Sequence, residues 1–158
     1  KSVAVRDWDG QGTSNKALEL FGGQKAQVDD PSDVLIYDTP PNLTHVATTT
    51  AVQRADVALV VTTPSPADLW EAEEAVRFVQ TKNSSTIVRV IFNKVRKGTV
   101  LGRIIPESAK QVSVPALAAM LSARECYQHA LGRGWQALDR SAREEVLQLT
   151  LAVLTLSR

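Results

Sequence analysis

Three acids and one amide stand at the ends of short apolar runs in this sequence. The first run ends in Asp7 and Asp9, the second in Asp38 and the fourth in Asn93. Carboxylates gathered at one place repel one another unless a cation lies between them, and Mg²⁺, bound through waters and substrate phosphates, suits such a group. A carboxamide both donates and accepts hydrogen bonds, so Asn93 is able to read the edge of a base. With Gly12, which allows close backbone approach to a ligand, these residues predict a nucleotide site.

The run that ends at Asp38 carries the clearest positional signal. Residues 34–37 show no polar alternation, which is typical of a strand buried on both faces. Pro40 and Pro41 lack backbone N–H groups, so the chain does not continue as a ladder or a helix. We therefore expect Asp38 at the carboxyl edge of a parallel sheet, where ligands bind in open α/β folds. The alternative is an aspartate that only caps the turn.

Short β-branched runs alternate with longer amphipathic stretches along the chain. The sequence predicts strands over Val3–Asp7, Val34–Asp38, Val57–Thr62 and 88–93. It predicts helices over 44–54, 66–80 and 100–110, and a last helix that opens near Ser141. This alternation is typical of an α/β fold with a mainly parallel sheet flanked by helices. Such a sheet brings the carboxyl ends of its strands, and hence the acids and the amide, to one edge.

Two of the predicted helices carry specific signals. Ser65 is expected as an N-cap, with Pro66 at the first helical position and Asp68 in the capping-box position. The last helix has one apolar stripe, formed by Ala142, Val146, Leu149, Val153 and Leu156. We interpret this stripe as core packing rather than a membrane anchor, because the polar face of the helix is not basic.

Length and composition indicate a single globular domain over residues 1–158. The apolar content of 44% and the charged content of 22% are ordinary for such a domain. The one cysteine, Cys126, excludes an internal disulfide framework. The single cysteine also fits a reducing cytoplasm. No apolar run approaches the length of about 18 residues that a membrane span needs, so no membrane association is expected.

The net charge of +1 hides an asymmetry between the two halves of the chain. Residues 1–80 carry 6 Lys and Arg against 12 Asp and Glu, whereas residues 81–158 carry 12 against 5. The densest basic stretch covers residues 89–110 and is suited to a polyanion. The alternative is an ordinary solvated surface with scattered charges.

Four segments, in the right order and spread over essentially the whole chain, resemble the ParA-type partition ATPases, the deviant Walker-A family that also includes MinD. DWDGQGT, which begins at Asp7, is similar to the family segment D-x-D-P-Q-G-N. DTPPNLTHVATTTAVQRADVALVVTTPSPADL, which begins at Asp38, resembles the Walker-B stretch and the strand after it. NKVRKGTVLGR looks like the base-contacting strand end, and LSARECYQHALGRGWQAL like the segment before the final helix.

The resemblance implies roles for individual residues. Asp38 would hold Mg²⁺ through water, and Asp9 would orient the attacking water in an in-line hydrolysis of ATP. Asp7 would lie in the second coordination sphere of the magnesium ion and would not bind the ion directly. Asn93 would hydrogen-bond adenine, and Gly12 would lie against the nucleotide. The cofactors implied are ATP and Mg²⁺.

The resemblance also implies partners. Two subunits would sandwich two ATP molecules, and this homodimer would bind DNA without sequence preference, for plasmid or chromosome partition near the bacterial nucleoid. A centromere-binding ParB-like protein would stimulate hydrolysis. The expected DNA-binding residues are Lys94, Arg96, Lys97, Arg103, Arg124, Arg133 and Arg140.

The departures from the family pattern leave alternatives open. Gly10 stands where the family has proline, Thr13 replaces a usual asparagine, and no K-G-G-x-G-K-[ST] phosphate-binding loop occurs in residues 1–158. We expect the domain to be incomplete at its N-terminus, without its first strand and P-loop, and these residues alone to hydrolyse little or no ATP. Removal of a central strand would leave two unpaired strand edges. The alternatives are a catalytically inactive ParA-like interaction protein and a positioning ATPase for another cargo.

Overall fold

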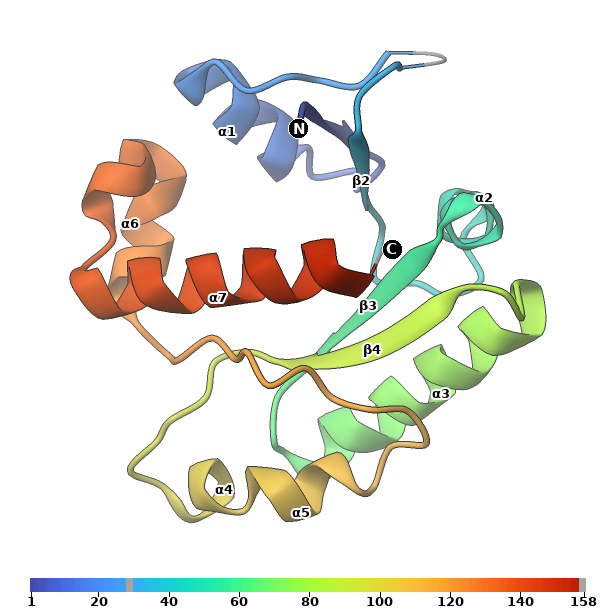
Figure 1. Ribbon diagram of the computed structural model, residues 1–158, viewed down its shortest axis with the longest axis vertical. Helices are drawn as coiled ribbons and strands as arrows, with labels where there is room; N and C mark the ends of the chain where they lie inside the picture. Colours follow the sequence, from blue (N-terminus) through green and yellow to red (C-terminus); the bar gives the residue numbers. More distant parts are fainter. Residues whose placement is uncertain (28–29, 157–158) are drawn as a thin grey trace.

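The predicted strands and most of the predicted helices are present in the computed structural model, which describes residues 1–27 and 30–156 (Figure 1). The strands lie close to their predicted bounds, and the fold is α/β. The elements in chain order are β1 Val3–Asp7, α1 Thr13–Phe21, β2 Val34–Asp38, α2 Val46–Arg54, β3 Val57–Thr62, α3 Pro66–Lys82, β4 Ile87–Phe92, α4 Val100–Arg103, α5 Ile105–Ala109, α6 Glu125–Arg133, the 3₁₀ helix η1 Gly134–Ala137 and α7 Arg140–Leu156.

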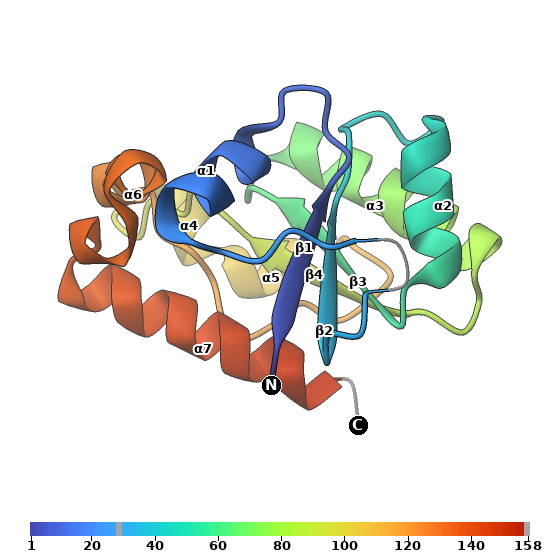
Figure 2. The same ribbon diagram turned by 90° about the horizontal axis from the view of Figure 1, so that it is seen from above.

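The strands form two separate parallel pairs, which agrees with the predicted parallel sheet in which two strand edges are unpaired. β1 pairs with β2, with Asp7 opposite Asp38, and β3 pairs with β4, with Thr62 opposite Phe92. Figure 1 shows the two pairs apart from one another, and in both views α1, α6 and α7 lie on one side of the strands and α2 and α3 on the other (Figure 2). The pairs are separate because, among the described residues, no strand joins β2 to β3.

The outer edges of the two pairs are covered by other parts of the chain. Val5 in β1 bridges Lys25, and Val90 in β4 bridges Ala116. The edge of β2 that faces away from β1, and the edge of β3 that faces away from β4, pair with no strand among the residues that the structure describes. We call these two edges the open edges.

The core lies around α3 and β4, and the strands with open edges take little part in it. Val76 and Val90 are buried almost completely, as is Phe92. In contrast, Ile36 in β2 is 47% exposed and Val61 in β3 is 60% exposed. The prediction that residues 34–37 are buried on both faces is therefore wrong for this structure, because no strand among the described residues covers the open edge of β2.

Several helix predictions need correction. The helix expected over 100–110 is divided into α4 and α5, because Pro106 has no N–H to continue the ladder. α1 and α6 are helices that the sequence pattern did not predict. Ser65 precedes α3 as expected but makes no side-chain cap; Thr63 bonds to the Asp68 carboxylate instead. Asp139 caps α7, since its carboxylate accepts from the Ala142 N–H at 2.8 Å, so the helix begins slightly before Ser141.

Within the described residues, no helix is long and apolar enough to cross a membrane.

Candidate functional site

The pairing of β1 with β2 places Asp7 beside Asp38 at the carboxyl edge, as predicted. The Asp7 carboxylate accepts the backbone N–H of Asp9 at 3.0 Å and that of Asn15 at 2.9 Å. Both of its oxygens are therefore used to hold the loop after β1 and the first turn of α1 in place. This geometry gives Asp7 a role in shaping the site, and its predicted catalytic role stays a prediction.

Asp38 is held by a hydroxyl group that the sequence reading did not identify. The Ser14 Oγ donates to the Asp38 carboxylate at 2.5 Å, across the interface between α1 and β2. Among the described residues, no backbone N–H of the turn at 39–41 donates to this carboxylate, so the geometry gives no support to the turn-capping alternative. A carboxylate and a hydroxyl at one strand end are hard oxygen donors, and they fit a Mg²⁺ ion that keeps most of its waters.

Asp9 and Gly12 shape the turn between β1 and α1. The Gly12 N–H donates to the Asp9 carbonyl at 3.0 Å, and the Asp9 carboxylate accepts weakly from Gln11 N–H at 3.3 Å. Gly12 has φ +63° at the N-cap of α1, a left-handed conformation that favours glycine. A side chain there would meet no atom within 4 Å, so backbone conformation, rather than crowding, explains this glycine.

An aromatic contact lies behind this turn. The ring of Trp8 lies 5.0 Å from that of Tyr37, and the Arg6 guanidinium is 5.9 Å from each ring. The backbone N–H of Trp8 donates to the Asp38 carbonyl at 2.8 Å. Trp8 thus connects the two strands that carry the acids, directly between Asp7 and Asp9 in the chain.

Asn93 lies at the carboxyl end of the other strand pair. Its N–H donates to the Thr62 carbonyl at 2.7 Å, and its side-chain oxygen accepts the Lys94 N–H at 2.8 Å. Lys94 has φ +53°, a left-handed backbone conformation that is uncommon for a residue other than glycine. The amide therefore lies at a tight, specific turn, where its carboxamide is held by its own backbone.

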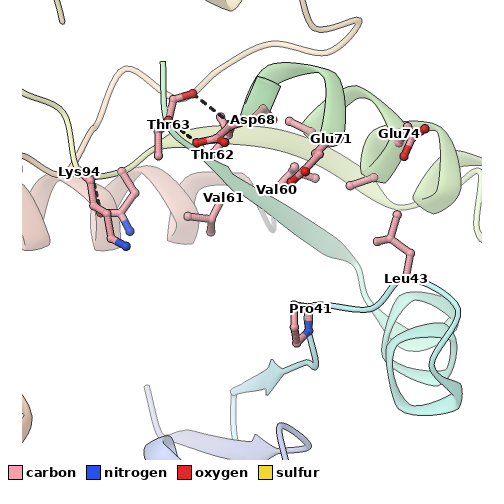
Figure 3. A pocket seen from close by; sticks show the side chains of 13 residues that line it. Pro41, Leu43, Val60, Val61, Thr62, Thr63, Asp68, Glu71, Glu74 and Lys94 are labelled. Carbon is pink, nitrogen blue, oxygen red and sulfur yellow. Dashed lines mark hydrogen bonds between the residues drawn. The ribbon is translucent and has the colours of Figure 1, made fainter. Parts of the chain in front are cut away.

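Two of the predicted nucleotide-site residues, Asn93 and Asp38, line two different cavities, whereas Asp7, Asp9 and Gly12 line neither. A cavity of about 750 Å³ is lined by Pro41, Val61, Asp68, Asn93 and further residues of β3 and α3. In Figure 3, Pro41 and Leu43 lie across this cavity from Val60 and Val61. A second cavity of about 530 Å³ contains Ser14 and Asp38. The acids and the amide thus share one edge of the fold without meeting in one pocket.

No three His, Cys, Asp or Glu side chains in the described part of the chain are close enough to hold a metal ion together. A magnesium site at Asp38 would accordingly depend on water and on a bound phosphate for its other ligands, which is common for this ion.

The predicted DNA-binding residues fall into two groups. Three of them have an acidic partner: Lys97 lies 3.4 Å and Arg124 3.5 Å from Glu145, and Arg140 lies 3.0 Å from Glu144. The other four are exposed and have no acidic partner within 4.0 Å among the described residues; they are Lys94, Arg96, Arg103 and Arg133. The second group is better suited to contact phosphates.

Glu145 is a buried acid that the sequence reading missed. It is 7% exposed and accepts hydrogen bonds from the Ser122 N–H at 2.8 Å, the Ser122 hydroxyl at 2.6 Å and the Tyr127 hydroxyl at 2.9 Å. Burial alone would raise the pKa of Glu145, but these bonds and Lys97 outweigh it and lower the pKa to about 2. Burial, together with the bond to Glu145, raises the pKa of Tyr127.

The lowered pKa of Glu145 predicts an acid-dependent loss of stability. The carboxylate stabilises the fold above its ordinary pKa of 4.5, and this contribution is lost as the pH falls from 4.5 toward 2. Glu145→Gln should therefore lower the free energy of unfolding at pH 7, and the difference from the parent should shrink steadily below about pH 5. Urea unfolding of both proteins at several pH values measures this difference in the free energy of unfolding. A difference that does not depend on pH would contradict the lowered pKa of Glu145.

No protein-family model matches the chain, and no curated protein matches its sequence. Solved structures do match. A putative plasmid partition protein of Borrelia burgdorferi bound to AMPPNP has a TM-score of 0.74 at 12% identity, covering 98% of this chain and 86% of that one. The MinD cell division protein of Aquifex aeolicus has a TM-score of 0.74 at 15% identity, covering 98% and 84%. A second plasmid partition protein structure from B. burgdorferi has a TM-score of 0.60 at 15% identity, covering 87% and 86%.

These likenesses establish the fold of the chain. It is the P-loop NTPase-like α/β fold of plasmid partition proteins and MinD, as the sequence resemblance implies.

Proposed function

From the fold that the chain shares with plasmid partition proteins and MinD, we propose that it is the larger part of a ParA-type ATPase that acts in DNA partition. The observation that carries the proposal is the pair of acids at the carboxyl edge of β1 and β2, with Asp38 held by Ser14. AMPPNP, an analogue of ATP, is bound by the Borrelia partition protein with this fold.

Each residue of the proposed nucleotide site would have its own role in ATP hydrolysis. Asp38 and the Ser14 hydroxyl would hold Mg²⁺, and the ion would supply positive charge beside the phosphates. Asp9 extends from the turn after β1 and would orient the attacking water, while Asp7 keeps that turn in shape. Asn93 would bind the adenine ring from the end of β4. Catalysis would come mainly from positioning and electrostatics, as in other phosphoryl transfers.

The phosphate-binding loop is proposed to come from residues before Lys1. The two open edges, and the cavity between residues 41–43 and β3, support this, because one parallel strand between β2 and β3 would pair both edges at once. Asp38 and Asn93 lie at the carboxyl ends of the pairs on either side. A loop at the carboxyl end of the added strand would therefore lie between the metal-binding and base-binding residues. We call the natural polypeptide with any residues before Lys1 the full-length protein.

The partners follow from the same proposal. The ATP-bound protein would be a homodimer that binds DNA of any sequence at the nucleoid, and a ParB-like centromere-binding protein would stimulate its hydrolysis. Lys94, Arg96, Arg103 and Arg133 support the DNA contact, since they are exposed and have no acidic partner within 4.0 Å in the described residues.

Hydrolysis of ATP by the purified full-length protein, with and without Mg²⁺ and with added duplex DNA, tests the proposed function. Magnesium-dependent turnover that increases with DNA supports a partition ATPase. Nucleotide binding with no turnover would replace it by the inactive interaction protein. Turnover without any DNA binding would favour a positioning ATPase for another cargo.

Asn93→Ala in the full-length protein should weaken ATP binding by about tenfold and leave binding of inorganic triphosphate unchanged. The hydrogen bonds that the variant removes are made to the ring, and a bonded carboxamide contributes roughly 1 kcal/mol, or more where a buried partner is left unpaired. Titration calorimetry with both ligands measures this. Equal losses for ATP and triphosphate would mean that Asn93 only terminates the strand.

Reversal of Arg96 and Arg103 to glutamate should lower the DNA affinity of the ATP-bound protein by at least about tenfold at low salt. These arginines would bind phosphates, so the salt dependence of binding should also decrease, by about 0.9 in logarithmic slope for each phosphate that the variant no longer neutralises. The matched control reverses Arg54 and Lys82, which are also exposed. Equal effects of the two double variants would show a general charge effect and reject the site.

A further inference from the structure

We propose that Glu145 is a positioning residue for the turn that carries Asn93, and so for recognition of the base. The proposal rests on the proposed function for its link to ATP. Its structural part, that Glu145 fixes this turn, is independent of any nucleotide.

Glu145 gathers groups from three other parts of the chain. Ser122 bonds to it through both its backbone and its hydroxyl, Tyr127 reaches it from α6, and Lys97 reaches it from the loop after β4. Arg124 adds a guanidinium at 3.5 Å. A carboxylate that is 7% exposed and satisfied by so many donors holds all of these groups in one arrangement.

The Ser122 segment is in turn bound to the Asn93 turn by backbone hydrogen bonds. The Leu121 N–H donates to the Phe92 carbonyl at 2.9 Å, and the Leu121 carbonyl accepts from the Val95 N–H at 3.0 Å. The Ala123 N–H donates to the Val95 carbonyl at 2.9 Å. Residues 121–123 therefore lie along residues 92–95 on both sides of Asn93 and Lys94, and Glu145 holds this segment at its central residue.

The turn at Asn93 and Lys94 has a strained backbone that neighbouring segments must hold in place. Lys94 adopts a left-handed conformation, at φ +53°, which is strained for a residue other than glycine. Strained conformations persist only where the surroundings determine them. Val95, directly after Lys94, is 1% exposed and bonded on both backbone groups to the 121–123 segment. Glu145 fixes Ser122, and the two neighbours of Ser122 hydrogen-bond to Val95, the residue after the strained Lys94.

The position of Glu145 on its helix points to the same role. It lies on the side of α7 that faces the protein, one turn after the fully buried Ala142. An apolar side chain there would contribute stability without an ion, since replacing a buried charged group by a well-packed apolar one is often neutral or stabilising. What the carboxylate adds is a fixed geometry for the segments that it joins.

Two measurements on the full-length protein test the inference, with Glu145→Gln as the variant and Tyr127→Phe as the matched control. Tyr127→Phe removes one bond to Glu145 and leaves both bonds from Ser122. Amide hydrogen exchange at residues 93–97 and 121–123, without nucleotide, should become at least about tenfold faster in Glu145→Gln and stay unchanged in the control. Unchanged exchange in Glu145→Gln would overturn the inference, whatever the protein binds.

The second measurement is a comparison of ligands. Glu145→Gln should lose about tenfold in ATP affinity and nothing in triphosphate affinity, and the loss should disappear in an Asn93→Ala background. Equal losses for both ligands, or losses that add to those of Asn93→Ala, would overturn the link to the base. If Glu145→Gln does not fold, Ser122→Ala replaces it, since that variant removes only the hydroxyl bond. A parent that binds no ATP contradicts the proposed function, and the exchange result still decides the structural part.

Discussion

Asp9→Ala in the full-length protein should bind MgATP with the parental affinity and lose hydrolysis by a factor of about 100 or more. Asp9 lies in the turn between β1 and α1, beyond the strand end where Asp7 and Asp38 pair. Its removal takes away the group that orients water and leaves the magnesium and base contacts in place. Single-turnover hydrolysis and equilibrium binding, measured on the same sample, separate these two effects.

Asp38→Ala should weaken the binding of ATP itself, whereas Asp9→Ala should affect only its hydrolysis. The affinity for ATP should lose most of its dependence on Mg²⁺, because the carboxylate that holds the ion is gone. Ser14→Ala should reproduce part of this loss. The matched control is Asp56→Ala, since Asp56 is an exposed aspartate before β3, away from the carboxyl edge. Lost stability of Asp38→Ala with an unchanged magnesium dependence would instead mean that Asp38 caps its turn.

For Asp9→Ala the contradicting result is different. Turnover of ATP at the parental rate would show that Asp9 does not orient the attacking water.

Val61→Glu should have a small effect on stability in residues 1–158 alone and a large one in the full-length protein. In residues 1–158 alone, the side chain is 60% exposed, so the free energy of unfolding should change by less than about 0.5 kcal/mol. In the full-length protein, a strand against the open edge of β3 would bury this position. The same change should then cost about 2–4 kcal/mol, from lost apolar burial and a desolvated charge.

Urea unfolding of both forms measures this difference. Leu131→Glu is the control, because Leu131 is similarly exposed, at 54%, but lies on α6. It should have a small effect in both forms. A Val61→Glu variant that is equally tolerated in both would show that nothing covers the open edge of β3.

The strands and their ends were predictable from the sequence because their signals are local. The apolar runs from Val3, Val34 and Val57 end where the structure ends them, and the two prolines after Asp38 set the end of β2. The placement of Asp7 and Asp38 at one edge followed from the rule that parallel strands share a carboxyl edge, whereas their direct pairing was not predicted. The likeness to partition proteins was carried by the order of several weak motifs along the chain.

The rest depended on contacts between distant segments. Two unpaired edges were expected from the absence of a P-loop segment in residues 1–158, but the exposure of single side chains was not. β2 and β3 have the apolar composition of central strands, yet Ile36 and Val61 are exposed because no strand of the described residues pairs with the open edges. Ser14 gave no signal, since a serine in the first turn of a helix is common. The burial of Glu145 could not be predicted, because the residues that bind it, Ser122 and Tyr127, lie 23 and 18 residues away in the chain.

The contact between Trp8 and Tyr37 gives the protein an optical reporter at the site itself. Trp8 is adjacent to Asp7 and Asp9 in the chain and its N–H is bonded to the Asp38 carbonyl, so a change in the turn alters the surroundings of its indole. The other two tryptophans are more exposed, at 70% for Trp70 and 47% for Trp135, and can be replaced by phenylalanine with little disturbance of the core. A protein that retains Trp8 alone would report the arrival of magnesium and nucleotide through its fluorescence, without any attached dye.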